Sequence, residues 1–272
     1  MPAPASAETN RPPCVVVTRP VAQAPGWVQA LRDAGLDAVS LPLITIAPVA
    51  DAEPARNAWE HLQEFSAVMF VSANAVEHFF CLRPAASARG GRSDESVVRA
   101  WVTGAGTRRS LRLFGWPEDR IDAPDDASEQ FDSETLWRQV QAQVRAGSRV
   151  LIVRGADDTG AWAGRDWLSL RLVEAGAQVE QLPVYRRMVP VLAPGEQALA
   201  QRCAAAGSVW LFSSSEAIRN LSTLLPGQDW RAARALVTHV RIGEAARAAG
   251  FGVVWTSRPA LADVVASIKS SG

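Results

Sequence analysis

The chain has few residues suited to disulfide or metal chemistry. Its three cysteines show no C-x-x-C spacing and are Cys14, Cys81 and Cys203. A disulfide framework would need an even set of cysteines, and a cysteine metal site would need closely spaced ones. The three histidines show no metal-ligand spacing either. We therefore expect reduced thiols, as in a cytoplasmic protein, and no bound metal.

The sequence also lacks net charge and long apolar runs. Its 28 lysines and arginines balance 28 acidic residues, so no overall positive field attracts nucleic acid. The longest apolar runs are strand-sized, far short of the roughly 18 residues that a membrane span needs. The opening MPAPASAETNRPP has no apolar core and no early positive cluster. We expect residues 1–13 to be a disordered leader, and no nucleic-acid or membrane partner.

Common catalytic and nucleotide-binding motifs are missing as well. The sequence contains no G-x-S-x-G elbow, no P-loop and no H-E-x-x-H. GAGTRR at 104–109 is similar to a dinucleotide loop, but Arg109 replaces the third glycine and the segment follows an internal strand. These absences leave the standard cofactor and nucleophile classes without support.

What the sequence does contain is a series of short apolar strands separated by helical patterns. Hydrophobic residues make up 48% of the chain, and the strand-like runs lie at 14–18, 67–72, 99–103, 149–155, 208–214, 235–238 and 252–257. Near-continuous apolar strands that alternate with helices are typical of parallel sheets covered on both faces. Two helical patterns end at glycines, 25–35 at Gly35 and 165–176 at Gly176. The sequence therefore predicts an α/β fold.

Two parts of the chain resemble each other. LRDAGLDAVSLP at 31–42 matches LRLVEAGAQVEQLP at 170–183, with a shift of 141. FVSANAV at 70–76 matches FSSSEAI at 212–218 with a shift of 142, and 102–116 matches 237–251 with a shift of 135. Three matches in the same order predict two copies of one α/β half.

The ends of the predicted strands carry small, hydroxylic or arginine residues. They are Thr18-Arg19, Ser72-Ala73-Asn74, Thr103-Gly104, Arg154-Gly155, Ser214-Ser215, Thr238-His239 and Thr256-Ser257. Ligands of open parallel sheets bind at the carboxyl ends of the strands, and helix N-termini there suit anions. Serine, threonine and asparagine also cap helices without binding anything. The sequence alone leaves both interpretations open.

The order of the motifs resembles one known family across residues 14–268. The motifs are VVVTRP, LPLITIAP, FVSANAV, VTGAGT, FDSETL, RVLIVRG, LPVYRR, LFSSSEAI and EAARAAGF. In this order and spacing the chain is similar to uroporphyrinogen-III synthase. The resemblance implies an enzyme of tetrapyrrole synthesis that needs no cofactor. Its substrate would be linear hydroxymethylbilane, which it would close with inversion of the last pyrrole ring.

The resemblance also implies an interleaved arrangement of domains, which the repeat alone leaves open. We expect two similar doubly wound, parallel-sheet domains of the flavodoxin-like kind, joined by a two-stranded linker. The first would be discontinuous and comprise 14–43 and 188–272, and the second would comprise 48–183. The connectors would be 44–47 and 184–187, both extended after a Leu-Pro pair. We expect a monomer that makes transient contact with the enzyme preceding it in the pathway.

Residue by residue, the resemblance implies one catalytic side chain and a set of carboxylate-binding residues. Tyr185 is the only tyrosine of the chain. It would face the cleft and donate a hydrogen bond to the departing hydroxyl of the substrate. A packing role for this tyrosine is the alternative. The predicted binding residues are Arg19, Ser72, Ala73, Asn74, Gly104, Thr107, Arg154, Ser214 and Ser215.

The second half departs from the family pattern, because THVRIGEAA has Ile242 where the copy of Thr107 would predict a hydroxyl. Thr238, His239 or Arg241 would then replace it. Two other classes remain open from the sequence: a non-catalytic two-lobed binding protein and a nucleotide-dependent α/β enzyme. The first would usually carry a signal peptide, and the second would need a phosphate loop where this chain reads TRPVAQAPG.

Overall fold

The computed structural model describes residues 14–85, 98–124, 133–157, 159–160, 167–205 and 207–271. The predicted leader, 1–13, lies outside the described residues. The chain divides into two compact units. Unit 1 consists of the described residues up to Thr45 together with those from Met188 onward, and unit 2 is Ile46–Arg187. The domains expected from the sequence were 14–43 with 188–272, and 48–183.

Unit 1 is built on a five-stranded sheet in the order β11-β10-β9-β1-β2, in which all neighbours run parallel. Its strands are β1 (Val15–Val17), β2 (Ala38–Ser40), β9 (Val209–Phe212), β10 (Arg234–Val237) and β11 (Val253–Thr256). Its helices are α1 (Ala24–Asp33), α8 (Pro194–Ala205), α9 (Ser215–Leu224), α10 (Val240–Ala248) and α11 (Leu261–Ser270). The central strands are buried on both faces, as apolar runs without alternation predict.

Apolar layers cover the unit 1 sheet. On one face, Val15, Val17 and Leu211 pack against Leu31 of α1 and Val264 of α11. Trp210 and Phe212 belong to an aromatic group with Trp230 and Phe251. Since side chains alternate along a strand, Trp210 and Phe212 lie on the face opposite Leu211.

Unit 2 has a six-stranded sheet in the order β3-β8-β7-β4-β5-β6. Its strands are β3 (Thr45–Pro48), β4 (Ala67–Phe70), β5 (Arg99–Val102), β6 (Ile121–Asp122), β7 (Arg149–Ala156) and β8 (Gln178–Met188). Its helices are α2 (Glu53–Glu60), α3 (Ala73–Cys81), α5 (Ala105–Leu113), α6 (Ser133–Val140) and α7 (Trp167–Glu174), with short 3₁₀ turns at Leu62–Glu64, Glu118–Arg120 and Gln141–Gln143. The pairs from β8 to β6 are parallel.

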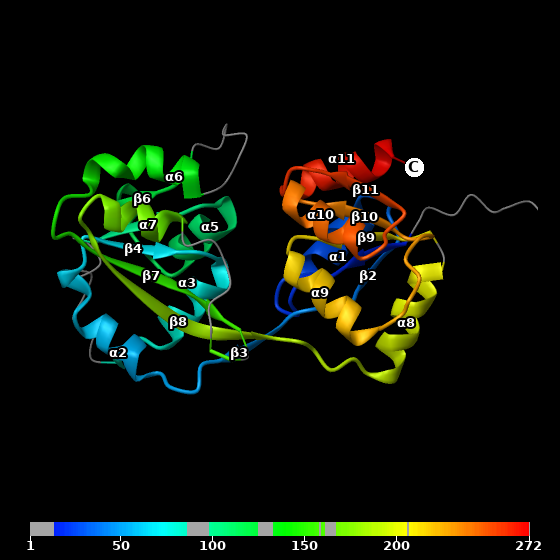
Figure 1. Cartoon of the computed structure of the whole chain (residues 1–272), viewed down its shortest axis with the longest axis horizontal. Helices are drawn as coiled ribbons and strands as arrows, with labels where there is room; N and C mark the ends of the chain where they lie inside the picture. The colour runs from blue at the N-terminus through cyan, green and yellow to red at the C-terminus, as the bar shows by residue number, and fades with distance from the viewer. Residues whose placement is uncertain are drawn as a thin grey trace, which may run out of the picture. The chain divides into compact units, whose positions relative to one another are not determined.

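Helices cover both faces of the unit 2 sheet (Figure 1). Residues of α2, α3 and α5 join one core cluster with Val68 and Phe70. Residues of α6 and α7 join another with Met69 and Ile152. We call these the α3 face and the α7 face of the sheet. Consecutive residues of a strand point to opposite faces of the sheet. Val68 and Phe70 therefore pack on the α3 face, and Met69 packs on the α7 face.

Strand register agrees with the predicted repeat. Val15 pairs with Ala38 and Val209, while Val150 pairs with Val179 and Ala67. Ala38 and Val179 differ by the predicted shift of 141, and Ala67 and Val209 differ by 142. The predicted helix ends are confirmed too. Gly35 and Gly176 have φ angles of 82° and 85°, a left-handed conformation in which glycine is the favoured residue after a helix.

The second Leu-Pro pair does not end a strand, in contrast to the sequence prediction. β2 ends at Ser40, just before Leu41-Pro42, and β3 begins at Thr45, whereas β8 continues through Leu182-Pro183 to Met188. The register shifts here, because Arg154 faces Pro183 but Gly155 faces Tyr185. Val184 is therefore the extra residue of a β-bulge, a position beside which a proline is tolerated within a sheet.

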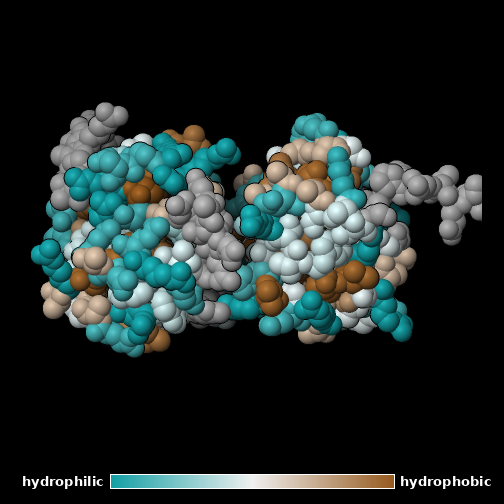
Figure 2. Space-filling view, turned by 90° about the horizontal axis from the view of Figure 1, so that it is seen from above, coloured by the Kyte–Doolittle hydropathy of each residue, from teal (hydrophilic) through white to brown (hydrophobic). Residues whose placement is uncertain are grey.

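Polar and apolar residues are mixed on the visible surface (Figure 2). Large exposed apolar side chains include Leu113 at 81%, Leu170 at 61% and Val253 at 53% exposure, and they come from separate elements. Within the described ranges, no helix combines the length and the apolar character that a membrane crossing requires.

Candidate active site

The predicted site residues of unit 2 follow neighbouring strands. β4 lies between β7 and β5 in the sheet. Ser72 comes just after β4 and Gly104 just after β5, while Arg154 lies near the end of β7. Because these strands are parallel, their carboxyl ends lie at one edge of the sheet. This edge brings residues from three separate chain segments together.

Ser72 has two roles at this edge. Its hydroxyl accepts a hydrogen bond from the Ala75 backbone N–H at 3.1 Å and so caps α3. The same oxygen lies 3.1 Å from the hydroxyl oxygen of Tyr185. Ser72 is therefore a helix cap that also holds the only tyrosine of the chain. A hydroxyl can both donate and accept, so the two contacts are compatible.

Tyr185 occupies a tightly fitted place on the α3 face. Its side chain is 3% exposed, and its ring stacks on His78 with ring centres 5.4 Å apart. Gly155 also lies against the ring, because an added Cβ there would sit 2.4 Å from the tyrosine Cζ. The β-bulge places both Val184 and Tyr185 in the same core cluster. Within unit 2 its ring is buried, and Gly155 leaves room for it. That Tyr185 faces a cleft stays a prediction.

Two residues that contact the tyrosine ring, His78 and Gly155, were not among the predicted site residues. Burial lowers the pKa of His78, and the neighbouring Glu77 partly opposes this effect. His78 lies one helical turn after Asn74 on α3, a spacing that could have indicated it. Gly155 gave no such signal, because its close contact arises only when β7 pairs with β8.

Arg154 lies on the other face of the sheet. It is 7% exposed, and its guanidinium donates to the Gln181 side-chain oxygen at 3.1 Å. Gln181 in turn donates to Ser169 of α7 at 2.7 Å. These contacts place Arg154 on the α7 face, whereas Tyr185 lies on the α3 face. The structure therefore does not bring these two predicted residues together.

The other predicted residues of unit 2 begin helices. Gly104 caps α5, and its carbonyl accepts hydrogen bonds from the N–H groups of Thr107 and Arg108 at 3.1 Å. Thr107 is only 7% exposed. Ala73 and Asn74 form the first turn of α3, with Ala73 half-buried and Asn74 buried. Backbone N–H groups at these helix starts suit a carboxylate better than the buried side chains do.

Unit 1 presents the corresponding edge of its own sheet. Ser214 caps α9 and accepts from the Glu216 N–H at 3.1 Å, and Ser215 is the first residue of that helix. His239 caps α10 through its Nδ1, which accepts from the Arg241 N–H at 3.1 Å. Its place corresponds to that of Gly104 in unit 2.

The departure at Ile242 has a packing explanation. Ile242 and Thr107 occupy equivalent turns of α10 and α5, and both are 7% exposed. An isoleucine is suited to a position that is buried in both units. No hydroxyl is needed at this place for the helix to form.

Arg19 is the predicted cation of unit 1. Its guanidinium lies over the Trp27 ring at 4.1 Å and donates to the Gln23 side-chain oxygen at 3.4 Å. Burial lowers its pKa to about 10, and its buried Nε has no hydrogen-bond partner among the described residues. A desolvated guanidinium with a spare donor is suited to binding a carboxylate.

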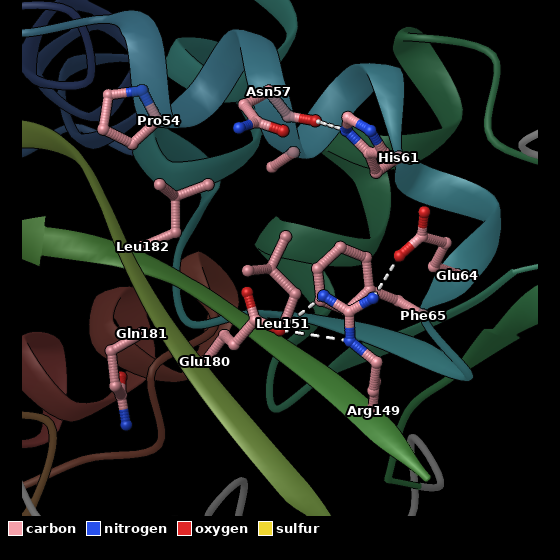
Figure 3. A pocket seen from close by; sticks show the side chains of 11 residues that line it. Pro54, Asn57, His61, Glu64, Phe65, Arg149, Leu151, Glu180, Gln181 and Leu182 are labelled. Atoms are coloured by element: carbon pink, nitrogen blue, oxygen red, sulfur yellow. Dashed lines mark hydrogen bonds and ion pairs between the residues drawn. The ribbon is translucent and has the colours of Figure 1, made fainter.

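A pocket of about 490 Å³ lies elsewhere in unit 2, near the amino-terminal half of β7 and β8 (Figure 3). Arg149 lies at its wall and donates hydrogen bonds to Glu64 and, at 2.7 Å, to Glu180. These two carboxylates raise the pKa of Arg149. His61 lines another side and contacts the Asn57 carbonyl. None of the predicted site residues lines this pocket, so it is distinct from the candidate site.

Comparison with known proteins assigns the chain to a family. Residues 26–266 match the family model of uroporphyrinogen-III synthase HemD. The chain belongs to the uroporphyrinogen-III synthase family. A curated uroporphyrinogen-III synthase of Synechococcus elongatus is 29% identical over 232 residues, which cover 84% of this chain and 82% of the relative. One of Chlorobaculum parvum is 28% identical over 180 residues, 65% of each chain.

Solved structures of this family share the fold. A mutant uroporphyrinogen III synthase of the extremely thermophilic bacterium Thermus thermophilus aligns with a TM-score of 0.58 at 15% identity, over 95% of this chain and 98% of that one. The uroporphyrinogen-III synthetase of Helicobacter pylori aligns with a TM-score of 0.56 at 15% identity, over 96% and 100%. These alignments agree with a mixed α/β fold containing parallel sheets.

Proposed function

We propose that this chain catalyses the reaction of its family, the closure of linear hydroxymethylbilane to uroporphyrinogen III with inversion of ring D and loss of water. The observation that carries the proposal is the match to the family over residues 26–266. The first step would be loss of hydroxide from the terminal hydroxymethyl group. Without an enzyme the resulting cation closes to the symmetric type I isomer, so the protein must mainly position the chain.

Tyr185 is the proposed proton donor to the departing hydroxyl. Ser72 already accepts a hydrogen bond from the Ala75 N–H, so its own proton is available for the tyrosine oxygen 3.1 Å away. A phenol that accepts this hydrogen bond keeps its single proton for the substrate. His78 and Gly155 pack against the tyrosine ring and hold it in place. This reduces the entropy cost of orienting the hydroxyl as a donor.

The carboxylates of the substrate are the proposed ligands of the strand-end residues. In unit 2 these are Ser72, Ala73, Asn74, Gly104, Thr107 and Arg154, and in unit 1 they are Arg19, Ser214 and Ser215. The helix starts after β4, β5 and β9 support this assignment with backbone donors. Because many N–H groups share the binding, we expect most single side-chain substitutions there to have small effects.

We also propose the finer organisation of the protein. Each unit would be a flavodoxin-like domain, which the strand orders β2-β1-β9-β10-β11 and β8-β7-β4-β5-β6 support. Segments 44–47 and 184–187 would connect them, supported by the neighbouring positions of β3 and β8. We propose a cytoplasmic monomer that makes transient contact with the enzyme supplying its substrate. The non-catalytic binding protein, the alternative from the sequence, is not favoured by membership in this family.

Isomer analysis tests the proposed activity. Hydroxymethylbilane is generated in situ, the protein is added, and the oxidised products are separated into uroporphyrins I and III. We expect predominantly type III. Type I alone, at the rate seen without protein, would reject the activity for a sample with a folded circular-dichroism spectrum.

The role of Tyr185 is tested by Tyr185→Phe, which keeps the ring and removes only the hydroxyl. We expect turnover to fall by about 10²-fold, the lower range for a lost general acid. The matched control is Ser222→Ala, which removes a hydroxyl from α9 at a position outside the candidate site. Full turnover and full type III selectivity in Tyr185→Phe would refute the assignment.

A further inference from the structure

The pocket beside α2 in unit 2 is a cavity that the proposed function does not use (Figure 3). Its volume of about 490 Å³ lies within the range of roughly 300–1,000 Å³ that is typical of small-molecule sites. Helix α2 supplies one side, and the amino-terminal halves of β7 and β8 supply another. The candidate active site lies at the carboxyl ends of the strands, so this pocket is a separate place in the same unit.

One wall of the pocket holds an arginine between two carboxylates. Arg149 donates through Nη1 to Glu64, and through Nε and Nη2 to a single oxygen of Glu180, at 3.2 and 2.7 Å. The guanidinium also lies over the Phe65 ring, 4.7 Å from its centre. Two carboxylates around one guanidinium leave this wall with one excess negative charge. Glu64 Oε1 and Glu180 Oε2 accept none of these bonds, so they remain available to a ligand.

His61 of the same pocket adds another acceptor. Its Nδ1 lies 3.0 Å from the Asn57 carbonyl oxygen. A carbonyl only accepts hydrogen bonds, so Nδ1 carries the proton, and Nε2 of the neutral ring is an acceptor. Carboxylate oxygens and an imidazole nitrogen together favour a ligand that brings N–H donors.

The rest of the lining includes apolar side chains. They are Pro54 and Ala58 of α2, Leu151 of β7 and Leu182 of β8. Leu151 and Leu182 also belong to the core cluster of the α3 face, so they form a fixed apolar surface. A ligand for this pocket therefore combines a polar, N–H-bearing group with an apolar body.

Unit 1 has no such charges at the equivalent place. By the strand register, Cys14 corresponds to Arg149 and Val39 corresponds to Glu180. The fold thus forms without the arginine and the carboxylate. The two ion pairs join side chains that are 32% to 48% exposed, and exposed ion pairs contribute little to stability. Neither the fold nor its stability therefore requires two carboxylates around Arg149.

We propose that this pocket binds a small organic cation, in which an ammonium or amidinium group is carried on an apolar body. The cationic N–H groups donate to the available oxygens of Glu64 and Glu180, and the apolar body packs on Leu151 and Leu182. A positive charge balances the excess negative charge of the wall, whereas an anion meets two carboxylates. The polycarboxylate substrate proposed for the other site is therefore not a ligand of this one.

The experiment titrates the full chain with benzamidine, an amidinium on a phenyl ring, and follows backbone N–H groups by NMR. We expect saturable binding of millimolar affinity, with chemical-shift changes in α2 and in the first halves of β7 and β8. Benzamide, which has the same shape without the charge, and the anion benzoate should each bind at least about 10-fold more weakly. Added salt should weaken the binding of benzamidine, because salt screens the charges of a partly exposed site.

Two substitutions test the charge and the shape of the pocket separately. Glu180→Gln removes the excess charge and should weaken benzamidine binding about 10-fold. The matched control is Glu244→Gln, at an exposed glutamate of α10 in unit 1, which should leave binding unchanged. Ala58→Phe fills the pocket from α2 and should abolish binding while the charges stay in place.

Several results would overturn the proposal. They are the absence of saturable benzamidine binding, equal binding of the three probes, shift changes confined to other regions, and full affinity in a folded Glu180→Gln variant. Circular dichroism checks the folding of each variant, and the charge test stands without Ala58→Phe. The outcome is independent of the proposed enzymatic activity, because none of these measurements uses turnover.

Discussion

The segments that follow the two Leu-Pro pairs show most clearly how the units differ. By the repeat, Ile44 of unit 1 corresponds to Tyr185 of unit 2, and both are buried, at 6% and 3% exposure. Asn220 of α9 corresponds to His78 of α3. Asn220 donates to the Leu43 carbonyl at 2.8 Å, whereas His78 stacks on Tyr185. In each unit the same helix position therefore contacts the segment after Leu-Pro.

This comparison separates the side-chain features required for packing from those required for the proposed chemistry. An aliphatic side chain fills the position in unit 1, so packing alone does not require a hydroxyl. Burying a hydroxyl without a hydrogen bond costs free energy. Ser72 provides the hydrogen-bond partner that offsets this cost for Tyr185. The hydroxyl of Tyr185 is thus an addition to a packing position, which fits the role proposed for it.

The largest expected effect comes from filling the space beside the tyrosine. Gly155→Ala would place a methyl group 2.4 Å from the ring, so the ring or β7 must move. We expect a loss of about 1–3 kcal/mol in the free energy of unfolding and a fall in turnover as large as that of Tyr185→Phe. Urea denaturation and isomer analysis measure the two effects.

Gly195→Ala is the matched control for this substitution. Gly195 lies in α8, and an added Cβ would meet nothing within 4 Å. We expect an unchanged or slightly higher stability, by about 0.5–1 kcal/mol at most. If Gly155→Ala behaved like this control, the described fit between Gly155 and Tyr185 would be wrong.

A smaller effect distinguishes the two capping serines. Ser72→Ala and Ser214→Ala should each cost about 1 kcal/mol of stability, because each removes a helix cap. Only Ser72 also contacts Tyr185. In double-mutant cycles on turnover, Ser72→Ala should therefore be coupled to Tyr185→Phe by about 0.5 kcal/mol or more, while Ser214→Ala should be additive. Equal additivity for both serines would contradict a positioning role for Ser72.

The smallest effect concerns the pH dependence of stability. Because burial lowers the pKa of His78, the unfolded chain binds its proton at higher pH than the folded chain. Stability should therefore decrease as the pH falls from about 7 towards 5, starting near the unfolded pKa of about 6.5. His78→Phe keeps a ring against Tyr185 and should show a shallower decrease in urea titrations.

Much of the fold was predictable because it depends on short local patterns. Runs such as Val15–Val17 are apolar on both faces, and Gly35 and Gly176 supply the left-handed conformation that ends a helix. The repeat predicted the correspondence of the strands in the two sheets. The serines at strand ends were identified as helix caps or ligands, and the structure confirms capping for Ser72 and Ser214.

The surroundings of Tyr185 were not predictable from local patterns. The bulge at Val184 depends on how β8 pairs with β7, and it sets which face each later residue occupies. Arg154 and Tyr185 consequently lie on different faces of the sheet, although both lie in the carboxyl-terminal halves of neighbouring strands. The contact with Gly155 likewise exists only after residues 30 positions apart in the chain have paired.

The division of the chain has a consequence for its synthesis. Unit 2 is one continuous segment, Ile46–Arg187, whereas unit 1 needs β9 as the neighbour of β1. During synthesis on the ribosome, β1 therefore cannot pair with β9 until the whole of unit 2 has been made. This takes roughly 7–28 s at 5–20 residues per second. During this time the apolar Val15–Val17 has no partner on its β9 side. Chaperones that bind exposed apolar segments would meet the nascent chain at this point.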